Sequence, residues 1–356
     1  MRTHGSTQIT CGTLALGFAL MSTGAHVSAG TLDPVADFYR GKTINFYIGY
    51  TVGGTYDLYA RLVARYMGKH IPGNPVILPR NMAGGGSRIA AGYVAKVAEK
   101  DGLSLATANQ SFVIEQAMGD KTLQFDVTTL NYIGNPIVVN NVLVTWATSN
   151  VNTIADAKAR IVTMGATGGT TSSQYPRATN ALLGTRFKII YGYPGGNEIN
   201  MAMENGEVDG RGSNDWVSWK ATKPDWLRDH KLNVLVQIGQ RREADLGNVP
   251  LLSELASNDE DKQLLELLSS PIMLGRQIFT APGVPSERIA ALRAAFDQTM
   301  QDPDFLSEAR HEKLDINPVS GQAMQDFVGK VIRKTPAATG QRLLSIVGDE
   351  GASAAR

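Results

Sequence analysis

Between residues 43 and 108 the pattern of a strand, a glycine-rich turn and a helix repeats three times, and this alternation constrains the fold more than any other feature. The first strand is expected at 43–50 and the third at 103–108. Strands that alternate with helices at this spacing are typical of an α/β layer with a mainly parallel sheet. The theme returns between residues 138 and 239, so the sequence predicts an α/β protein with two lobes.

The first 29 residues have the order of a secretory signal peptide. A weakly basic start is followed by a short apolar run at 13–21 and by the small residues Val27-Ser28-Ala29 before Gly30. A membrane anchor is the alternative, but the run has about half of the ~20 residues that a spanning helix needs. Cys11 precedes the run and lacks the residues of a lipobox. We expect cleavage near Gly30 and export to the periplasm.

Charge and motifs exclude several function classes. Lys plus Arg is 34 and Asp plus Glu is 33, so the net charge of +1 gives no global footprint for nucleic acid. The one cysteine excludes disulfide scaffolds and CxxC metal or redox sites. The sequence contains no His-Glu-x-x-His, no Gly-x-Ser-x-Gly and no P-loop ending. We expect no catalytic residue, no metal, no cofactor and no nucleic-acid partner.

Three glycine-rich turns, each before a helix, are the strongest candidate for a ligand site. A helix start exposes unpaired N–H groups and a partial positive charge, and glycine lets a ligand approach the backbone. Ordinary βα turns are the alternative for each turn taken alone, and Asp57 also suits the first turn of a helix. The residues expected at the ligand are Gly53, Gly54, Thr55 and Asp57, then Gly85, Gly86 and Ser87, and then Thr167, Gly168, Gly169, Thr171 and Ser172.

Three further residues are candidates for the same cleft. Gln110 follows the third strand, although a helix cap explains its segment equally well. Tyr193 lies in an aromatic, glycine-rich turn that would form an apolar wall. Arg211 stands between glycines, where a guanidinium can hold a carboxylate with two hydrogen bonds; a solvated or salt-bridged arginine is the alternative.

Seven short fragments, in order along the chain, resemble the substrate-binding proteins of tripartite tricarboxylate transporters, the Bug family. The resemblance runs from about Tyr47 to Phe327. The fragments are Gly53-Gly54-Thr55-Tyr56-Asp57-Leu58-Tyr59-Ala60-Arg61, Asn81-Met82-Ala83-Gly84-Gly85-Gly86-Ser87, Asp101-Gly102-Leu103-Ser104-Leu105, Gly192-Tyr193-Pro194-Gly195, Gly206-Glu207-Val208-Asp209, Pro250-Leu251-Leu252-Ser253-Glu254 and Ala281-Pro282-Gly283-Val284-Pro285.

The resemblance implies a type II periplasmic binding protein fold with two lobes and a ligand cleft between them. It also implies a ligand carboxylate held by the first βα turn and by turns of the second lobe, partly through waters. The chain departs from the family pattern at Ala83, Ser87 and Gly192-Tyr193-Pro194. Ser213 falls near a position where many members have an aspartate that helps to choose the ligand. With Arg211 close by, we expect the distal end of this pocket to accept an anion.

These observations combine into one expected function. Lobe I would comprise residues 30–136 and 241–356, and lobe II residues 137–240. The protein would be a monomer that captures a small organic mono- or dicarboxylate and delivers it to membrane transporter subunits, without chemical change. A ligand-sensing partner of a two-component receptor fits the sequence as well. A secreted hydrolase would require His70, His230 or His311 beside a serine in the cleft.

Overall fold

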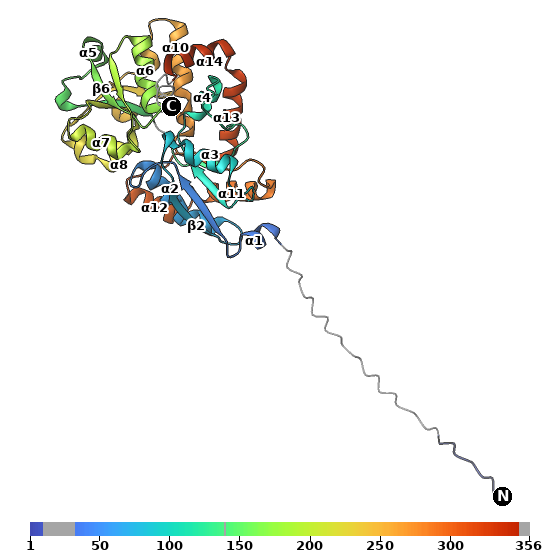
Figure 1. The fold of residues 1–356 in the computed structure, drawn as a ribbon. Helices are drawn as coiled ribbons and strands as arrows, with labels where there is room; N and C mark the ends of the chain where they lie inside the picture. The colour runs from blue at the N-terminus through green and yellow to red at the C-terminus, as the bar shows by residue number, and fades with distance from the viewer. Residues whose placement is uncertain (10–32, 139, 349–356) are drawn as a thin grey trace. The chain divides into compact units, whose positions relative to one another are not determined.

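The computed structural model describes residues 1–9, 33–138 and 140–348 (Figure 1). Residues 1–33 form a unit separate from residues 34–356, and the account below concerns the second unit. The expected apolar run and cleavage site of the leader lie outside the described residues, so export remains a prediction. None of the helices in the described part of the chain combines the length and apolar character needed to cross a bilayer.

The second unit alternates strands and helices along its length. The strands are β1 (Thr43–Ile48), β2 (Val76–Asn81), β3 (Ser104–Thr107), β4 (Asn131–Asn135), β5 (Asn141–Trp146), β6 (Val162–Gly165), β7 (Phe187–Ile190), β8 (Gly210–Asp215), β9 (Leu232–Ile238), β10 (Ile278–Thr280) and β11 (Val319–Ser320). The α-helices are α1 (Pro34–Tyr39), α2 (Thr55–Met67), α3 (Arg88–Lys96), α4 (Phe112–Ala117), α5 (Ile154–Ala159), α6 (Thr171–Leu183), α7 (Gly196–Glu204), α8 (Trp216–Thr222), α9 (Pro224–Arg228), α10 (Asp259–Ser269), α11 (Ser286–Thr299), α12 (Pro303–His311), α13 (Gly321–Lys334) and α14 (Ala337–Val347). Short 3-10 helices occupy Gly68–His70, Gly85–Ser87, Ala147–Ser149, Ala244–Leu246, Leu252–Leu255 and Ser270–Leu274.

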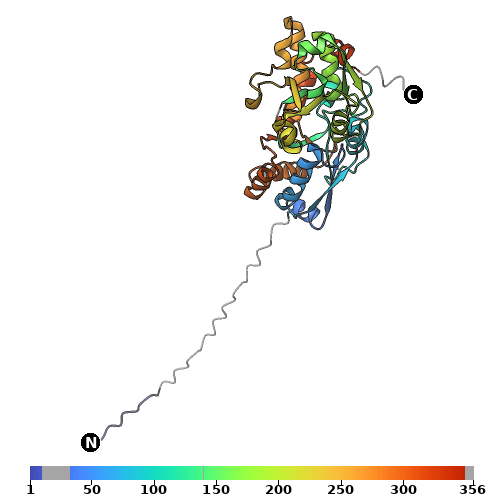
Figure 2. The same cartoon turned by 90° about the vertical axis from the view of Figure 1, so that its left-hand side faces the viewer.

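The strands form two sheets with the same plan. The first has the order β11-β4-β10-β3-β1-β2 and the second β7-β6-β8-β5-β9. In each, the strand next to one edge (β1 or β6) pairs in parallel with both of its neighbours, and the chain leaves it through a glycine-rich turn into a helix. Both views separate the blue and cyan strands of the first sheet from the green and yellow strands of the second (Figures 1 and 2).

The expected parallel pairing is found among β1, β2 and β3 and among β6, β7 and β8, but each sheet also contains an interior strand that runs the other way. β10 runs antiparallel to β3 and β4, and β5 runs antiparallel to β8 and β9. Each of these strands enters its sheet directly after the chain has crossed from the other sheet. Strand direction there is set by the crossing, a long-range property that a local strand–helix pattern does not contain.

The chain crosses between the sheets twice, first from β4 to β5 and then from β9 to β10. An asparagine at each end of the first crossing is hydrogen-bonded to the second crossing. Asn135, at the end of β4, donates to the carbonyls of Ile137 (2.7 Å) and Met273 (3.0 Å) and accepts from the N–H of Arg276 (2.9 Å). Asn140, before β5, donates to the carbonyl of Arg241 (2.6 Å). The two crossings are therefore fastened side by side.

The lobe limits expected from the sequence remain a prediction, although the sheets divide the chain in a related way. Strands of the first sheet lie at 43–135 and 278–320, and those of the second at 141–238. Helices α11 and α13 pack on β4 of the first sheet. Helix α14 packs on both α4 and α6, so the C-terminal part contacts elements beside both sheets (Figure 1).

Helix α2 begins where expected but buries a different stripe. The sequence suggested a face of Leu58, Leu62 and Tyr66. The structure buries Leu62 with Tyr59 and Met67, and it leaves Leu58 and Tyr66 only partly covered. By contrast, the face expected for α11 is confirmed, because its Ile289, Leu292 and Phe296 are all buried. Helix α5 is capped by Thr153, whose side chain accepts the N–H of Asp156.

Candidate functional site

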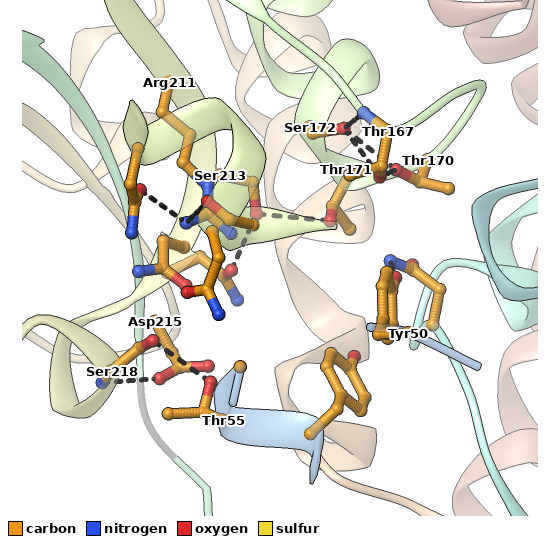
Figure 3. Close-up of a pocket in the computed structure, with 18 of the residues that line it drawn as sticks. Tyr50, Thr55, Thr167, Thr170, Thr171, Ser172, Arg211, Ser213, Asp215 and Ser218 are labelled. Atoms are coloured by element: carbon orange, nitrogen blue, oxygen red, sulfur yellow. Dashed lines mark hydrogen bonds between the residues drawn. The ribbon is translucent and has the colours of Figure 1, made fainter. Parts of the chain in front are cut away.

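Turns and strand ends from both sheets line one pocket. Its volume is about 700 Å³, open solvent at its mouth included. Figure 3 shows that the turns after β1 and β6 contribute side chains to the same space. The residues that line it are Tyr50, Thr51, Gly54, Thr55, Tyr56, Asn109, Gln110, Asn141, Thr167, Thr170, Thr171, Ser172, Gly196, Asn197, Asn200, Arg211, Ser213, Asn214, Asp215, Ser218, Thr222 and Arg276.

The turn between β1 and α2 is held in place by a buried acid of its own. Asp57 Oδ2 accepts the N–H of Gly53 at 3.0 Å, and both carboxylate oxygens accept Arg61 Nε at 2.9 Å. Burial alone would raise the pKa of Asp57, but the hydrogen bonds from Arg61, Gly53 and Asn81 hold it below its usual value. Asp57 thus fixes the turn from behind, while Gly54 and Thr55 face the pocket.

The turn between β6 and α6, which we call the ligand turn (residues 167–172), presents hydroxyl groups and no charge. The hydroxyls of Thr167 and Thr170 lie 3.2 Å apart, and those of Thr170 and Ser172 lie 3.0 Å apart. Thr170 is the N-cap residue of α6, although its side chain makes no capping hydrogen bond. Because the first N–H groups of a helix lack intrahelical partners, this wall offers both hydroxyl and N–H donors to an anion.

Arg211 carries a positive charge that no acid neutralises at close range. Its Nη1 donates to the carbonyl of Gly196 (3.3 Å) and to Asn200 Oδ1 (3.1 Å), and its guanidinium lies 5.6 Å from the ring centre of Trp219. Its Nε is buried without a hydrogen-bond partner. In the described part of the chain no carboxylate lies within ion-pair distance of it. Burial lowers the pKa of Arg211 to about 10, which leaves the group charged at neutral pH.

A second arginine, Arg276, is neutralised within the protein. It forms a buried ion pair with Asp215, and its Nη2 donates to Thr55 Oγ1 at 2.8 Å. The hydroxyl of Thr55 lies 3.0 Å from that of Ser218, whose N–H is bound by Asp215 at 2.8 Å. These residues form a closed ring between the starts of α2 and α8. The guanidinium of Arg276 also lies 4.0 Å from the ring centre of Tyr56.

The part of the pocket between the two arginines is polar and uncharged. The Ser213 hydroxyl lies 2.7 Å from Asn141 Oδ1 and 3.2 Å from the hydroxyl of Thr171. The amide nitrogen of Asn214 is buried without a partner. Donors and acceptors are therefore available beside Arg211 for a polar ligand group.

Half of the residues expected from the sequence line this pocket and half do not. The lining includes the expected Gly54, Thr55, Gln110, Thr167, Thr171, Ser172, Arg211 and Ser213. The expected residues that lie outside the lining are Gly53, Asp57, Gly85, Gly86, Ser87, Gly168, Gly169 and Tyr193.

The turn at 84–87 lies against the ligand turn and not in the pocket wall. A Cβ on Gly86 would come within 2.3 Å of Thr170 Cγ2, and the backbone of Gly86 has φ +63°. Glycine here permits a close approach between the two turns. Ser87 is the N-cap residue of α3 but makes no side-chain cap, and its hydroxyl accepts the N–H of Asn109 at 2.8 Å. Tyr193 packs on the apolar cluster of the second lobe, together with the buried Trp219.

Sequence reasoning missed several lining residues, above all Arg276 and Asp215. Neither stands in a glycine-rich turn, and 61 positions separate them, so no local signal marks the pair. Asn109 is the neighbour of the expected Gln110, and its side-chain amide donates to the hydroxyl of Tyr50 at 2.7 Å. No histidine lines the pocket, and the described residues contain no cluster of His, Cys, Asp and Glu suited to a metal ion.

Comparison with known proteins gives consistent matches over most of the chain. A family model described as tripartite tricarboxylate transporter family receptor matches residues 59–342. The "UPF0065 protein in gbd 5'region" of Cupriavidus necator is 28% identical over 339 residues, which covers 92% of this chain and 93% of that protein.

Solved structures with the same fold include periplasmic binding proteins. BugD aligns with a TM-score of 0.68 at 17% identity, over 87% of this chain and 99% of that chain. An R. palustris protein with adipate gives a TM-score of 0.64 at 22% identity, over 86% and 97%. MatC of Rhodopseudomonas palustris, with bound malate, gives 0.65 at 18% identity, over 84% and 99%. The chain thus has the two-lobed α/β periplasmic binding protein fold.

Proposed function

The chain belongs to the tripartite tricarboxylate transporter receptor family, and we propose that its pocket binds a small organic carboxylate for delivery to the membrane subunits of such a transporter. Membership makes the protein a solute receptor and not an enzyme. The proposal also places the protein in the periplasm, after removal of residues 1–29, and treats it as a monomer. The solved relatives that hold adipate and malate support a carboxylate as the ligand.

The observation that carries the proposal is the unpaired charge of Arg211. Of the residues that line the pocket in the described part of the chain, Asp215 alone is acidic, and Arg276 already neutralises it. Arg211 therefore leaves an excess positive charge in a polar pocket. A guanidinium prefers a carboxylate as partner, because the two groups can form paired, charge-assisted hydrogen bonds.

Two helix starts supply a second place for negative charge. Gly54 and Thr55 open α2, and Thr171 and Ser172 open α6, and all four residues face the pocket. We propose that one carboxylate lies between these turns and that a second carboxylate, or another polar end of the ligand, reaches Arg211. Hydrogen bonds to a charged group contribute roughly 1.5–3 kcal/mol each, so four or five approach the ~8 kcal/mol of micromolar binding after ordering costs.

Calorimetry on the wild-type protein tests the proposal. The panel contains aliphatic four- to six-carbon dicarboxylates, the matched monocarboxylates, the matched neutral diamides and the matched diamines. We expect micromolar dissociation constants for at least one acid and no binding of its diamide or diamine. A diamide that binds as tightly as its acid, or an absence of carboxylate binding at millimolar concentration, would contradict the proposal.

A further inference from the structure

An ion pair of the first lobe, between a partly exposed arginine and a fully buried acid, contacts the ligand turn from the side that faces away from the pocket. Arg88, the first residue of α3, donates from Nη2 to Glu115 Oε2 (2.7 Å) and to the carbonyl of Gly169 (3.2 Å). Glu115 lies in α4 and is completely buried. Gly169 belongs to the ligand turn, so a single guanidinium joins an acid of one lobe to the backbone of the other.

The second lobe reaches back to the same pair. Gln174, in the second turn of α6, donates from Nε2 to Glu115 Oε1 (3.3 Å) and lies 3.4 Å from the carbonyl of Gly169. The hydroxyl of Ser111 completes the partners of Glu115, at 2.6 Å. Arg88 and Gln174 thus converge on one peptide carbonyl, and Glu115 holds both donors.

Close backbone packing accompanies these hydrogen bonds. The ideal Cβ position of Gly168 lies 3.5 Å from the backbone nitrogen of Gly86, and Thr170 lies against Gly86. The ligand turn therefore contacts the first lobe on one side and lines the pocket on the other. Its own hydrogen bonds, such as that from the N–H of Thr170 to Gly168 O at 2.8 Å, span only a few residues.

We propose that Arg88 and Glu115 are positioning residues, which hold the ligand turn in its binding geometry from across the lobe interface. This inference rests on the proposed function, because the turn matters only if the pocket binds a ligand. Neither residue lines the pocket. The pair acts through the Gly169 peptide, which fixes where the Thr170 and Ser172 hydroxyls and the first N–H groups of α6 point. Loss of the pair would speed ligand release more than it would slow capture.

The alternative is that the pair only stabilises the first lobe, by joining α3 to α4. A matched control separates the two roles. Asp302, in the C-terminal part, is a buried acid like Glu115, and its partners are Lys69 and His70. None of these three residues contacts the ligand turn. Asp302→Asn should therefore lower the melting temperature and leave the ligand turn unchanged.

Amide hydrogen exchange on the ligand-free protein is the first test. We expect Arg88→Met to raise the exchange rate of the 167–174 segment about tenfold, and Gln174→Leu, which keeps the ion pair, to raise it by a smaller factor. Asp302→Asn should leave this segment at the wild-type rate. Exchange of the segment that is unchanged in both Arg88→Met and Gln174→Leu would overturn the proposal.

Stopped-flow kinetics with the carboxylate that binds best in the calorimetry is the second test. Glu115→Gln and Arg88→Met should raise the dissociation rate about five- to tenfold and change the association rate less than twofold. If the dissociation rates match those of Asp302→Asn, the pair has only a structural role. The exchange experiment needs no ligand, so it decides the positioning role separately from the calorimetry that decides the proposed function.

Discussion

The two sheets follow one topology, yet the turns that they present to the pocket are stabilised in different ways. The turn after β1 is fixed by its own helix, because Asp57 binds Gly53 N–H from behind. In the turn after β6 the polar side chains are all hydroxyls. Its Gly169 carbonyl accepts a hydrogen bond from Arg88 of the first lobe. The turn of the first lobe is therefore stabilised within its own lobe, whereas the turn of the second lobe depends in part on a hydrogen bond from the first lobe.

The pocket arginines differ in a similar way. Arg276 precedes β10 of the first sheet and is paired with Asp215 at the end of β8 in the second. Arg211, within β8, has no such partner among the described residues. One guanidinium therefore fastens the lobes together, and the other remains available to a ligand.

The largest expected effect is a difference between the two arginines in how much each contributes to the free energy of unfolding. Arg276→Met leaves Asp215 buried without its counter-ion, which should lower the free energy of unfolding by about 3–5 kcal/mol. Arg211→Met removes no ion pair. It loses the hydrogen bonds to Gly196 O and Asn200 Oδ1 but also relieves the cost of burying an unpaired charge, so it should cost about 1 kcal/mol or less. Urea unfolding of both variants measures the difference, and the double variant Arg276→Met/Asp215→Leu should regain most of the loss. Equal losses for Arg276→Met and Arg211→Met would show that the two arginines are not distinguished in this way.

Substitution of Asn135 and of Asn140 should give a smaller difference in the free energy of unfolding. Asn135→Ala deprives four backbone groups of partners, on Ile137, Met273 and Arg276. Asn140→Ala deprives only Arg241 O and Gln237 Oε1. At about 1 kcal/mol or somewhat less per lost group, we expect losses of about 3 and 1–2 kcal/mol in the free energy of unfolding. Thermal and urea denaturation measure both, and a larger loss for Asn140→Ala would contradict this ranking.

A hydroxyl of the ligand turn should affect binding and have only a small effect on stability, because Ser172 Oγ also accepts the N–H of Thr167 at 3.1 Å. Ser172→Ala removes one donor from the wall after β6, which should weaken carboxylate binding by about 1 kcal/mol, roughly fivefold. The melting temperature of the ligand-free protein should stay within a degree or two of the wild type. Isothermal titration calorimetry measures the affinity, and differential scanning calorimetry on the same samples measures the melting temperature. Unchanged affinity would remove the Ser172 hydroxyl from the ligand site.

The smallest expected effect is the share of the acid pH dependence of stability that Asp57 contributes from the wall after β1. The pKa of Asp57 is lower in the folded protein than in an unfolded chain, so its contribution to stability is present above the ordinary carboxyl pKa of about 4 and is lost as the pH falls through the folded value. Asp57→Asn should flatten the acid limb of a stability–pH curve. Ser172→Ala, which removes no titratable group, should leave that limb unchanged. An acid limb that is unaltered in Asp57→Asn would argue against this role.

The sequence predicted the local parts of this architecture and missed those that depend on distant residues. The turns at Gly54–Thr55 and at Thr167–Ser172 were predicted because a strand end, glycine and hydroxyls lie together in the sequence. The antiparallel directions of β5 and β10 were not predicted, since they follow from the crossings between sheets. The Asp215–Arg276 pair carried no local signal either. Gly86 shows a third case, in which a correctly noticed glycine serves packing between turns and lies outside the pocket lining.

In the proposed function Arg211 receives an anionic group of the ligand, and calorimetry on the wild type and Arg211→Ala tests this role most directly. The ligands are a dicarboxylate that binds the wild type and the monocarboxylate of the same chain length. We predict that Arg211→Ala weakens the dicarboxylate by about 2 kcal/mol or more, as for one partner of a desolvated charge pair, and hardly affects the monocarboxylate. Equal losses for the two ligands, or none for either, would contradict the claim.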